Sequence, residues 1–161
     1  MIALILATLV LLPALAAQVS VEFDESTDFE SFVTYALQDG TPARRIEVQI
    51  SIEGFIKREL DQRGMLLVQD SPDILVRTYA LVDKLTLEEL ADQTTWEFYT
   101  GLSDMDAYSV RAGTLVVDIV DGSGERVLWR GLIAAPVGGS VASVEKKLDK
   151  AVAKMFRHFP R

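Results

Sequence analysis

The sequence contains no cysteine and a single histidine, His158, among its 161 residues. Without cysteine the chain has no thiol nucleophile, no disulfide and no cysteine-type zinc site, and one histidine excludes multi-histidine metal sites. A domain of this size needs no disulfides to fold, because its core is large enough. No segment of the chain has the form of a catalytic motif, so we expect no catalytic residues, no metal ligands and no cofactor-binding residues.

Charge is missing from the first seventeen residues, Met1–Ala17, which are almost wholly apolar. Ala14 and Ala16 supply the small residues that precede a signal-peptidase site. A membrane-spanning helix needs about 20 apolar residues, and polar sequence begins at Gln18, so the run is short for an uncleaved anchor. We expect residues 1–17 to be a cleaved signal peptide. The mature protein is then periplasmic or secreted, with no stable membrane anchor after cleavage.

The formal net charge is -8, from 24 acidic and 16 basic residues. Such a surface repels nucleic acid unless a local basic patch intervenes. The two candidate patches, around Arg44-Arg45 and Lys146-Lys147, both lie among acidic neighbours. We expect no nucleic-acid partner.

Residues 18–161 have the length and composition of one domain. Alternation of apolar and polar residues predicts the strands, of which residues 113–121 are the clearest, and the glycines of residues 121–124 suit a hairpin loop. Asp39-Gly40-Thr41-Pro42 predicts a break after the second strand. The expected strands are Val19–Phe23, Val33–Ala36, Met65–Gln69, Ile74–Val82, Gly113–Asp121 and Arg126–Ala134, with Thr94–Tyr99 as an irregular strand and Asp83–Gln93 as a helix or loop.

Two segments predict helices. In Pro42–Arg63, helical spacing competes with strand alternation over residues 46–53, and we favour a helix with Thr41 as N-cap and with Ile46 and Ile50 widening the buried face. Ser140–Phe159 has an apolar stripe and Ser140 as a plausible N-cap. Each helix is apolar on one side only. The order of elements predicts an α+β fold, a two-layer sandwich with a mostly antiparallel sheet and two helices packed on one face.

Several short segments, in order along the mature chain, resemble a bacterial envelope family known as domain of unknown function 4136. The most specific is Leu128-Trp129-Arg130-Gly131; the others include Val21-Glu22-Phe23-Asp24, Pro72-Asp73-Ile74-Leu75-Val76, Gly113-Thr114-Leu115-Val116-Val117-Asp118 and Phe159-Pro160. The resemblance implies a small secreted protein or lipoprotein and supplies no reaction. Many family members have a lipobox cysteine, which this sequence lacks.

Arginine and aromatic residues on the strands form the candidate binding surface, because such residues are common interface anchors. Trp129 is expected in the core under a helix, and Arg130 is expected to pair with Asp118 or Glu125 across the hairpin. The candidate binding residues are Arg77, Tyr79, Trp96, Tyr99 and Arg130.

Four carboxylates, Asp104, Asp106, Asp118 and Asp121, support a weaker alternative. Clustered oxygens suit Ca²⁺, but the twelve-residue loop pattern is incomplete and Asp121 is an ordinary turn-former. The main hypothesis is a non-enzymatic periplasmic or envelope domain that binds or assembles with an unknown envelope protein or component. A carboxylate- or metal-dependent hydrolase of the envelope is the alternative.

Overall fold

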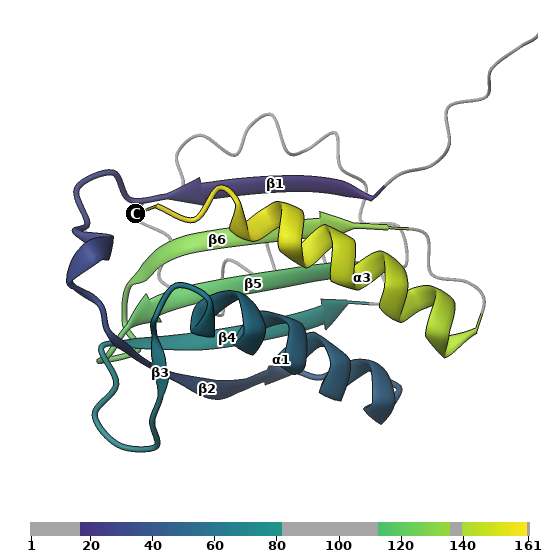
Figure 1. Cartoon of the computed structure of the whole chain (residues 1–161), viewed down its shortest axis with the longest axis horizontal. Helices are drawn as coiled ribbons and strands as arrows, with labels where there is room; N and C mark the ends of the chain where they lie inside the picture. Colours follow the sequence, from purple (N-terminus) through teal and green to yellow (C-terminus); the bar gives the residue numbers. More distant parts are fainter. Residues whose placement is uncertain (1–16, 82–112, 136–139, 161) are drawn as a thin grey trace, which may run out of the picture.

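The computed structural model describes residues 17–81, 113–135 and 140–160. Strands make up most of the elements in these ranges, and the helices lie between or after them along the chain (Figure 1). In order they are β1 (Gln18–Phe23), the 3-10 helix η1 (Phe29–Ser31), β2 (Thr34–Thr41), α1 (Ile46–Asp61), β3 (Leu66–Leu67), β4 (Ile74–Leu81), β5 (Thr114–Asp121), β6 (Val127–Ala134) and α3 (Val141–Phe156). In this part of the chain no helix is long and apolar enough to cross a membrane.

The strands form one sheet in the order β1-β6-β5-β4-β2-β3. The pairs β1·β6, β5·β6 and β4·β5 are antiparallel. The pairs β2·β4 and β2·β3 are parallel. Parallel pairing of β2 with β4 follows from α1, because a crossover element returns the chain to the same end of the sheet. The expected α+β fold is confirmed, and its sheet is mixed.

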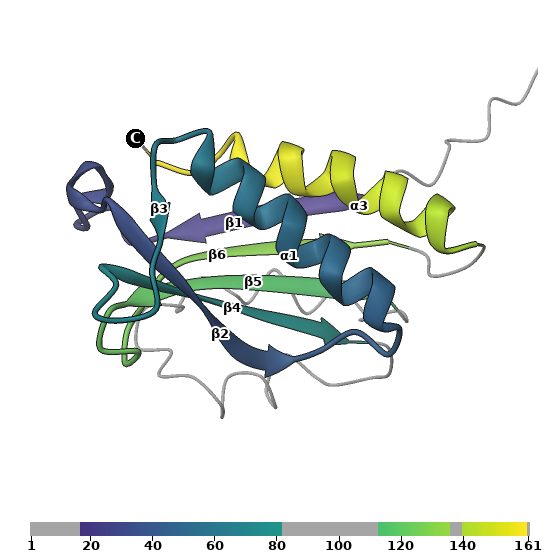
Figure 2. The same ribbon diagram turned by 60° about the horizontal axis from the view of Figure 1, so that its bottom comes forward.

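Both helices cover the same face of the sheet and contact each other, which makes two layers (Figure 2). The core lies between these layers. On its sheet side are Leu115, Val117 and Ile119 of β5, and on its helix side are Ile52, Ile56 and Leu60 of α1. These side chains lie at alternate positions of the strand and at helical spacing on α1, as the sequence patterns predict.

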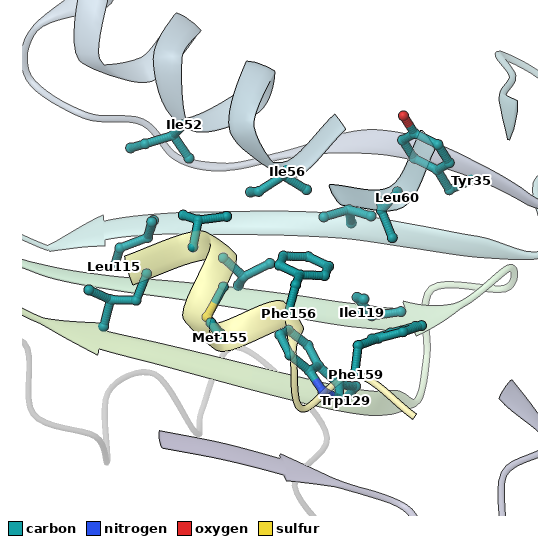
Figure 3. Close-up of a cluster of buried hydrophobic side chains, with 14 of the residues drawn as sticks. Tyr35, Ile52, Ile56, Leu60, Leu115, Ile119, Trp129, Met155, Phe156 and Phe159 are labelled. Atoms are coloured by element: carbon teal, nitrogen blue, oxygen red, sulfur yellow. The ribbon is translucent and has the colours of Figure 1, made fainter. Parts of the chain in front are cut away.

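An aromatic cluster fixes α3 to β6, as Figure 3 shows. The Trp129 ring lies 5.3 Å from that of Phe156 and 5.7 Å from that of Phe159, centroid to centroid. Trp129 and Phe156 have no exposed surface. Such pairs add about 0.5–1.5 kcal/mol to the stabilisation from burial alone. The expectation that Trp129 packs under a helix is confirmed.

The start of α1 differs from the expectation. The helix begins at Ile46 rather than Pro42, and its N-cap Arg45 makes no side-chain cap bond, so Thr41 is not the cap. Ile46 and Ile50 are 66% and 62% exposed and do not widen the buried face. Val48, Ile52, Ile56 and Leu60, which follow the helical spacing in the sequence, form the buried face as expected.

The other helix is closer to prediction. Ser140 caps α3 by accepting a hydrogen bond from the Ser143 N–H through its side chain. The helix ends at Phe156, and Phe159 lies in the turn beyond it, where it still packs in the core. The apolar periodicity therefore predicts which residues of this segment are buried, but it does not predict the residue at which the helix ends.

Strand β2 continues through Asp39-Gly40-Thr41, where the sequence predicted a break. Gly40 permits this because a Cβ there would lie 2.1 Å from the Thr78 carbonyl oxygen of β4. The register shifts between Gln38 and Thr41 at this close approach.

Strand β3 is shorter than expected, at Leu66–Leu67. The segments predicted at residues 83–93 and 94–99, and nearly all of the leader, lie outside the described residues.

Candidate functional site

Five polar side chains form one line across five strands on the sheet face opposite the helices. The register places Glu22 of β1 opposite Arg130 of β6, and Arg130 opposite Asp118 of β5. It also places Asp118 opposite Arg77 of β4, and Arg77 opposite Gln38 of β2. Directly opposed residues interact most strongly in a sheet. We call Glu22, Arg130, Asp118, Arg77 and Gln38 the polar row; its four charges alternate in sign.

The centre of the polar row is a buried ion pair. Asp118 is 0% exposed and Arg130 is 5% exposed. Arg130 donates hydrogen bonds from Nε and Nη2 to the two carboxylate oxygens of Asp118. This two-point contact is the strongest form of arginine–carboxylate pairing. The expected pairing of Arg130 across the hairpin is confirmed, with Asp118 as the partner.

Burial shapes the titration of the row. It raises the pKa of Asp118, and the hydrogen bonds and charge of Arg130 oppose that rise. Burial also raises the pKa of Glu22, again opposed by the charge of Arg130. At the other end, Arg77 donates to the Gln38 side chain and to the Gly124 carbonyl oxygen. The row therefore joins the strands through contacts within the chain.

The structure brings together three of the five predicted binding residues. Arg77, Tyr79 and Arg130 occupy the same sheet face, as their strand positions predicted. Tyr79 and Arg130 are buried there, and Arg77 is half-buried. Trp96 and Tyr99 lie outside the described residues, so the five-residue surface stays a prediction.

The predicted carboxylate group is described only in part, because Asp104 and Asp106 lie outside the described residues. Asp118 is held by Arg130, and Asp121 organises the hairpin turn. Asp121 accepts hydrogen bonds from the Ser123 hydroxyl at 2.8 Å and the Glu125 N–H at 3.0 Å. Burial tends to raise the pKa of Asp121, but these and other backbone bonds hold it below its usual value. No group of three potential metal ligands occurs among residues 17–81, 113–135 and 140–160.

A second surface lies at the sheet edge formed by β3 and the start of β2, visible in Figure 2. Its side chains Val33, Leu66 and Leu67 are 59%, 65% and 46% exposed. The Leu66 N–H donates to the Val33 carbonyl oxygen and the Val68 N–H to that of Tyr35, both at 2.9 Å. We call Val33, Leu66 and Leu67, with the adjoining backbone, the β2–β3 edge.

Asp73 anchors the β2–β3 edge to β4. Its Oδ2 accepts hydrogen bonds from the Val33 N–H at 2.9 Å, and from the Thr34 N–H and hydroxyl at 2.8 Å each. The Asp73 N–H in turn donates to the Thr34 hydroxyl at 3.0 Å. The hydrogen bonds from Val33 and Thr34 lower the pKa of Asp73, and the bond from the Val33 N–H is the largest cause. The sequence marked Asp73 only as a turn residue, because its partners are distant along the chain.

Replacing Asp118 tests the buried pair. Asp118→Asn leaves the Arg130 charge buried without a counter-charge on β5, so we expect unfolding free energy to fall by about 3–5 kcal/mol. The double variant Asp118→Leu, Arg130→Met removes both charges, so we expect its unfolding free energy to fall by less than that of Asp118→Asn. Urea unfolding measures both, with the exposed Glu125→Gln as control. A double variant less stable than Asp118→Asn would contradict this account.

Because the Asp73 carboxylate anchors the β2–β3 edge, we expect the stability of the protein to fall in acid. Its pKa in the folded state lies below the ordinary value of 3.8, so its stabilising contribution is present above that value. The contribution is lost as the pH falls through the folded-state pKa. Asp73→Asn is therefore expected to flatten the acid limb of the stability–pH curve, measured by urea unfolding at a series of pH values. Asp70→Asn, from the same turn, is the control; an unchanged acid limb in Asp73→Asn would show that the carboxylate does not anchor the edge.

Solved structures share this fold at low identity. A PDZ domain protein from Parabacteroides distasonis aligns with a TM-score of 0.56 and 15% identity, over 91% of this chain and 37% of that chain. PelC from Paraburkholderia phytofirmans, described as a dodecamer, aligns with a TM-score of 0.52 and 11% identity, over 86% of this chain and 93% of that chain. A search of curated proteins found no match.

The resemblance noted in the sequence is tested by a family model. The model described as domain of unknown function (DUF4136) matches residues 19–161, which include all of the described strands and helices except Gln18, the first residue of β1. The chain belongs to this family.

Proposed function

We propose that this protein is an exported domain of the bacterial envelope that binds a partner protein and catalyses no reaction. The observation that carries the proposal is the β2–β3 edge. Its three apolar side chains face solvent beside a strand edge, rather than packing in the core. Leu66 and Leu67 are consecutive in the strand, so their side chains point to opposite faces of the sheet. Exposed apolar side chains on an edge strand favour pairing with another chain.

The backbone supports the same use of this edge. The Val33 and Tyr35 carbonyl oxygens point toward β3, and by alternation the Leu37 carbonyl points the same way. Strand β3 pairs with β2 only at Thr34 and Tyr35. Among the described residues, no strand therefore pairs with Leu37 on this side of β2. An extended segment of a partner adds to such an edge through main-chain hydrogen bonds, while side chains give specificity.

The side chains of β3 strengthen this argument. Exposed edge strands are usually protected by short length, lysine, proline or a bulge, and β3 has the first of these protections because it contains two residues. Here both strand residues are leucine, and both are exposed. Asp73 holds the edge in place from β4. The partner proposed for this edge is therefore an extended, largely apolar peptide segment.

Export is the second part of the proposal. It rests on the uncharged leader at residues 1–17 and on the small residues before Ala17. Membership of the DUF4136 family agrees with an envelope location. The PelC structures are described as dodecamers, so a protein of this fold occurs in an assembly.

The hydrolase alternative gains no support from the described residues. Asp118 is neutralised by Arg130 within the sheet, and Asp121 is occupied by the turn. General acid–base catalysis needs a carboxylate that reaches the substrate. The predicted surface of Arg77, Tyr79, Trp96, Tyr99 and Arg130 stays a second candidate for partner binding.

One capture experiment tests the proposal. The mature protein is used as bait in envelope extract, beside a Leu66→Lys, Leu67→Lys variant whose charges oppose apolar contact. We expect the variant to bind the partner at least about tenfold more weakly than the wild type and so to capture less of it, which corresponds to about 1.4 kcal/mol of binding free energy. Ile46→Lys, an equally exposed position on α1, is the matched control and is expected to retain it. The native protein is expected to lack its leader by mass spectrometry.

Two results would contradict the proposal. Equal capture by the wild type and the β3 variant would exclude the β2–β3 edge as the binding surface. Native protein with Met1 intact in the cytosolic fraction would exclude export.

A further inference from the structure

The outer side of α3 and of the turn that follows it carries only basic side chains. Every residue that is exposed between positions 146 and 158 is a lysine, an arginine or a histidine. Five of them lie within about 100° of one another around the helix, along about 16 Å of its length. We call these five residues the α3 basic face: Lys146, Lys147, Lys150, Lys154 and Arg157.

The two acidic residues of α3 are engaged on another side of the helix. Glu145 accepts a hydrogen bond from the Ser51 hydroxyl of α1 at 2.7 Å. Asp149 pairs with Arg58 of α1, also at 2.7 Å. Within residues 17–81, 113–135 and 140–160, no carboxylate forms an ion pair with the α3 basic face. The lysines that stand among acidic neighbours in the sequence are therefore separated from them by the fold.

Contacts within the chain do not account for this grouping of charge. Lys146 and Lys150, and then Lys150 and Lys154, are four residues apart, and like charges at that spacing destabilise a helix. The helix dipole favours cations only in the last turn. It accounts for Lys154 and Arg157 but not for the three lysines that precede them. The α3 basic face thus costs some stability that an anionic surface outside the chain would restore.

Charge is also distributed unevenly along the sequence. Residues 140–161 contain six basic and two acidic residues, a net charge of +4 in a chain of -8, so the remaining residues carry -12. The α3 basic face lies opposite the buried side of α3, on the outside of the helical layer (Figure 1). A helix is about 10–12 Å wide, and the Debye length is about 8 Å at physiological ionic strength. Charges on the far side of the molecule are therefore largely screened from a surface that touches this face.

The residue types indicate what kind of surface fits. Four of the five cations are lysines, whose mobile point charges suit many dispersed anions, whereas bidentate recognition of a single phosphate or carboxylate favours arginine. Among the described residues, no large apolar side chain is exposed on α3. Aromatic anchors dominate protein interfaces, and stacked aromatic rings bind single-stranded nucleic acid. A membrane surface needs neither, because anionic lipid headgroups attract clusters of lysine and arginine through charge alone.

We propose that the α3 basic face holds the folded protein against a membrane surface that contains anionic phospholipid. The contact is electrostatic and reversible, because the apolar side of α3 is packed in the core and none of it inserts between lipids. It is therefore not a stable membrane anchor. The inference depends neither on export nor on the β2–β3 edge, since purified protein and defined vesicles test it.

Vesicle co-sedimentation tests the proposal on the purified native protein. We expect binding to vesicles of equal parts phosphatidylglycerol and phosphatidylcholine, no binding to phosphatidylcholine alone, and release by about 0.5 M salt. The variant Lys146→Gln, Lys150→Gln, Lys154→Gln is expected to bind at least about tenfold more weakly. Its thermal unfolding midpoint is expected to equal or exceed that of the wild type, because repulsion between like charges is relieved.

The matched control removes three exposed cations from other elements. Arg45→Gln, Lys57→Gln, Arg126→Gln changes the net charge by the same amount and is expected to bind vesicles as the wild type does. Three results would overturn the proposal. They are no binding to the phosphatidylglycerol vesicles at low salt, equal loss of binding in both triple variants, and binding to duplex DNA or polyglutamate as tight as binding to the vesicles.

Discussion

The constraint on which this structure depends is the burial of Asp118 opposite Arg130. Side chains alternate between the faces of a strand, so a shift of one residue would carry the Asp118 carboxylate into the apolar layer beneath the helices. A buried charge without its partner is strongly destabilising. The pair therefore acts mainly by excluding other registers of β5 and β6, and Glu22 and Arg77 extend that constraint to the neighbouring strands.

With the register fixed, the opposite face of the same strands presents a continuous apolar surface. Ile119 and Trp129 are directly paired there, and Phe156 and Phe159 pack on the Trp129 ring. This arrangement gives the sheet a firmly held centre. The β2–β3 edge is different, because its apolar side chains face water and its anchor is the carboxylate of Asp73. The β2–β3 edge, proposed for binding, thus lies away from the centre of the sheet.

Sequence reasoning succeeded where the deciding contacts are local. The hairpin of residues 121–124 brings β5 and β6 together, so the pairing of Arg130 with Asp118 was predictable, as was Trp129 in the core. Glu22 and Gln38 were not identified, because their neighbours depend on pairing between distant strands. Ile46 and Ile50 were wrongly added to the buried face of α1, because the strand-like alternation of residues 46–53 groups them with Val48 and Ile52, which do pack in the core. The exposure of Leu66 and Leu67 was equally inaccessible, since nothing in the sequence marks β3 as the edge.

Native-state hydrogen exchange tests this account of a fixed centre and an accessible edge most directly. The account predicts that amides of residues 116–119 and 129–132 exchange only through global unfolding, with free energies equal to that of the whole domain. The Leu66 and Val68 amides are predicted to exchange through local opening at lower free energy. Exchange of the β5 and β6 amides as readily as those of β3 would contradict the claim that the Asp118–Arg130 pair holds the centre of the sheet.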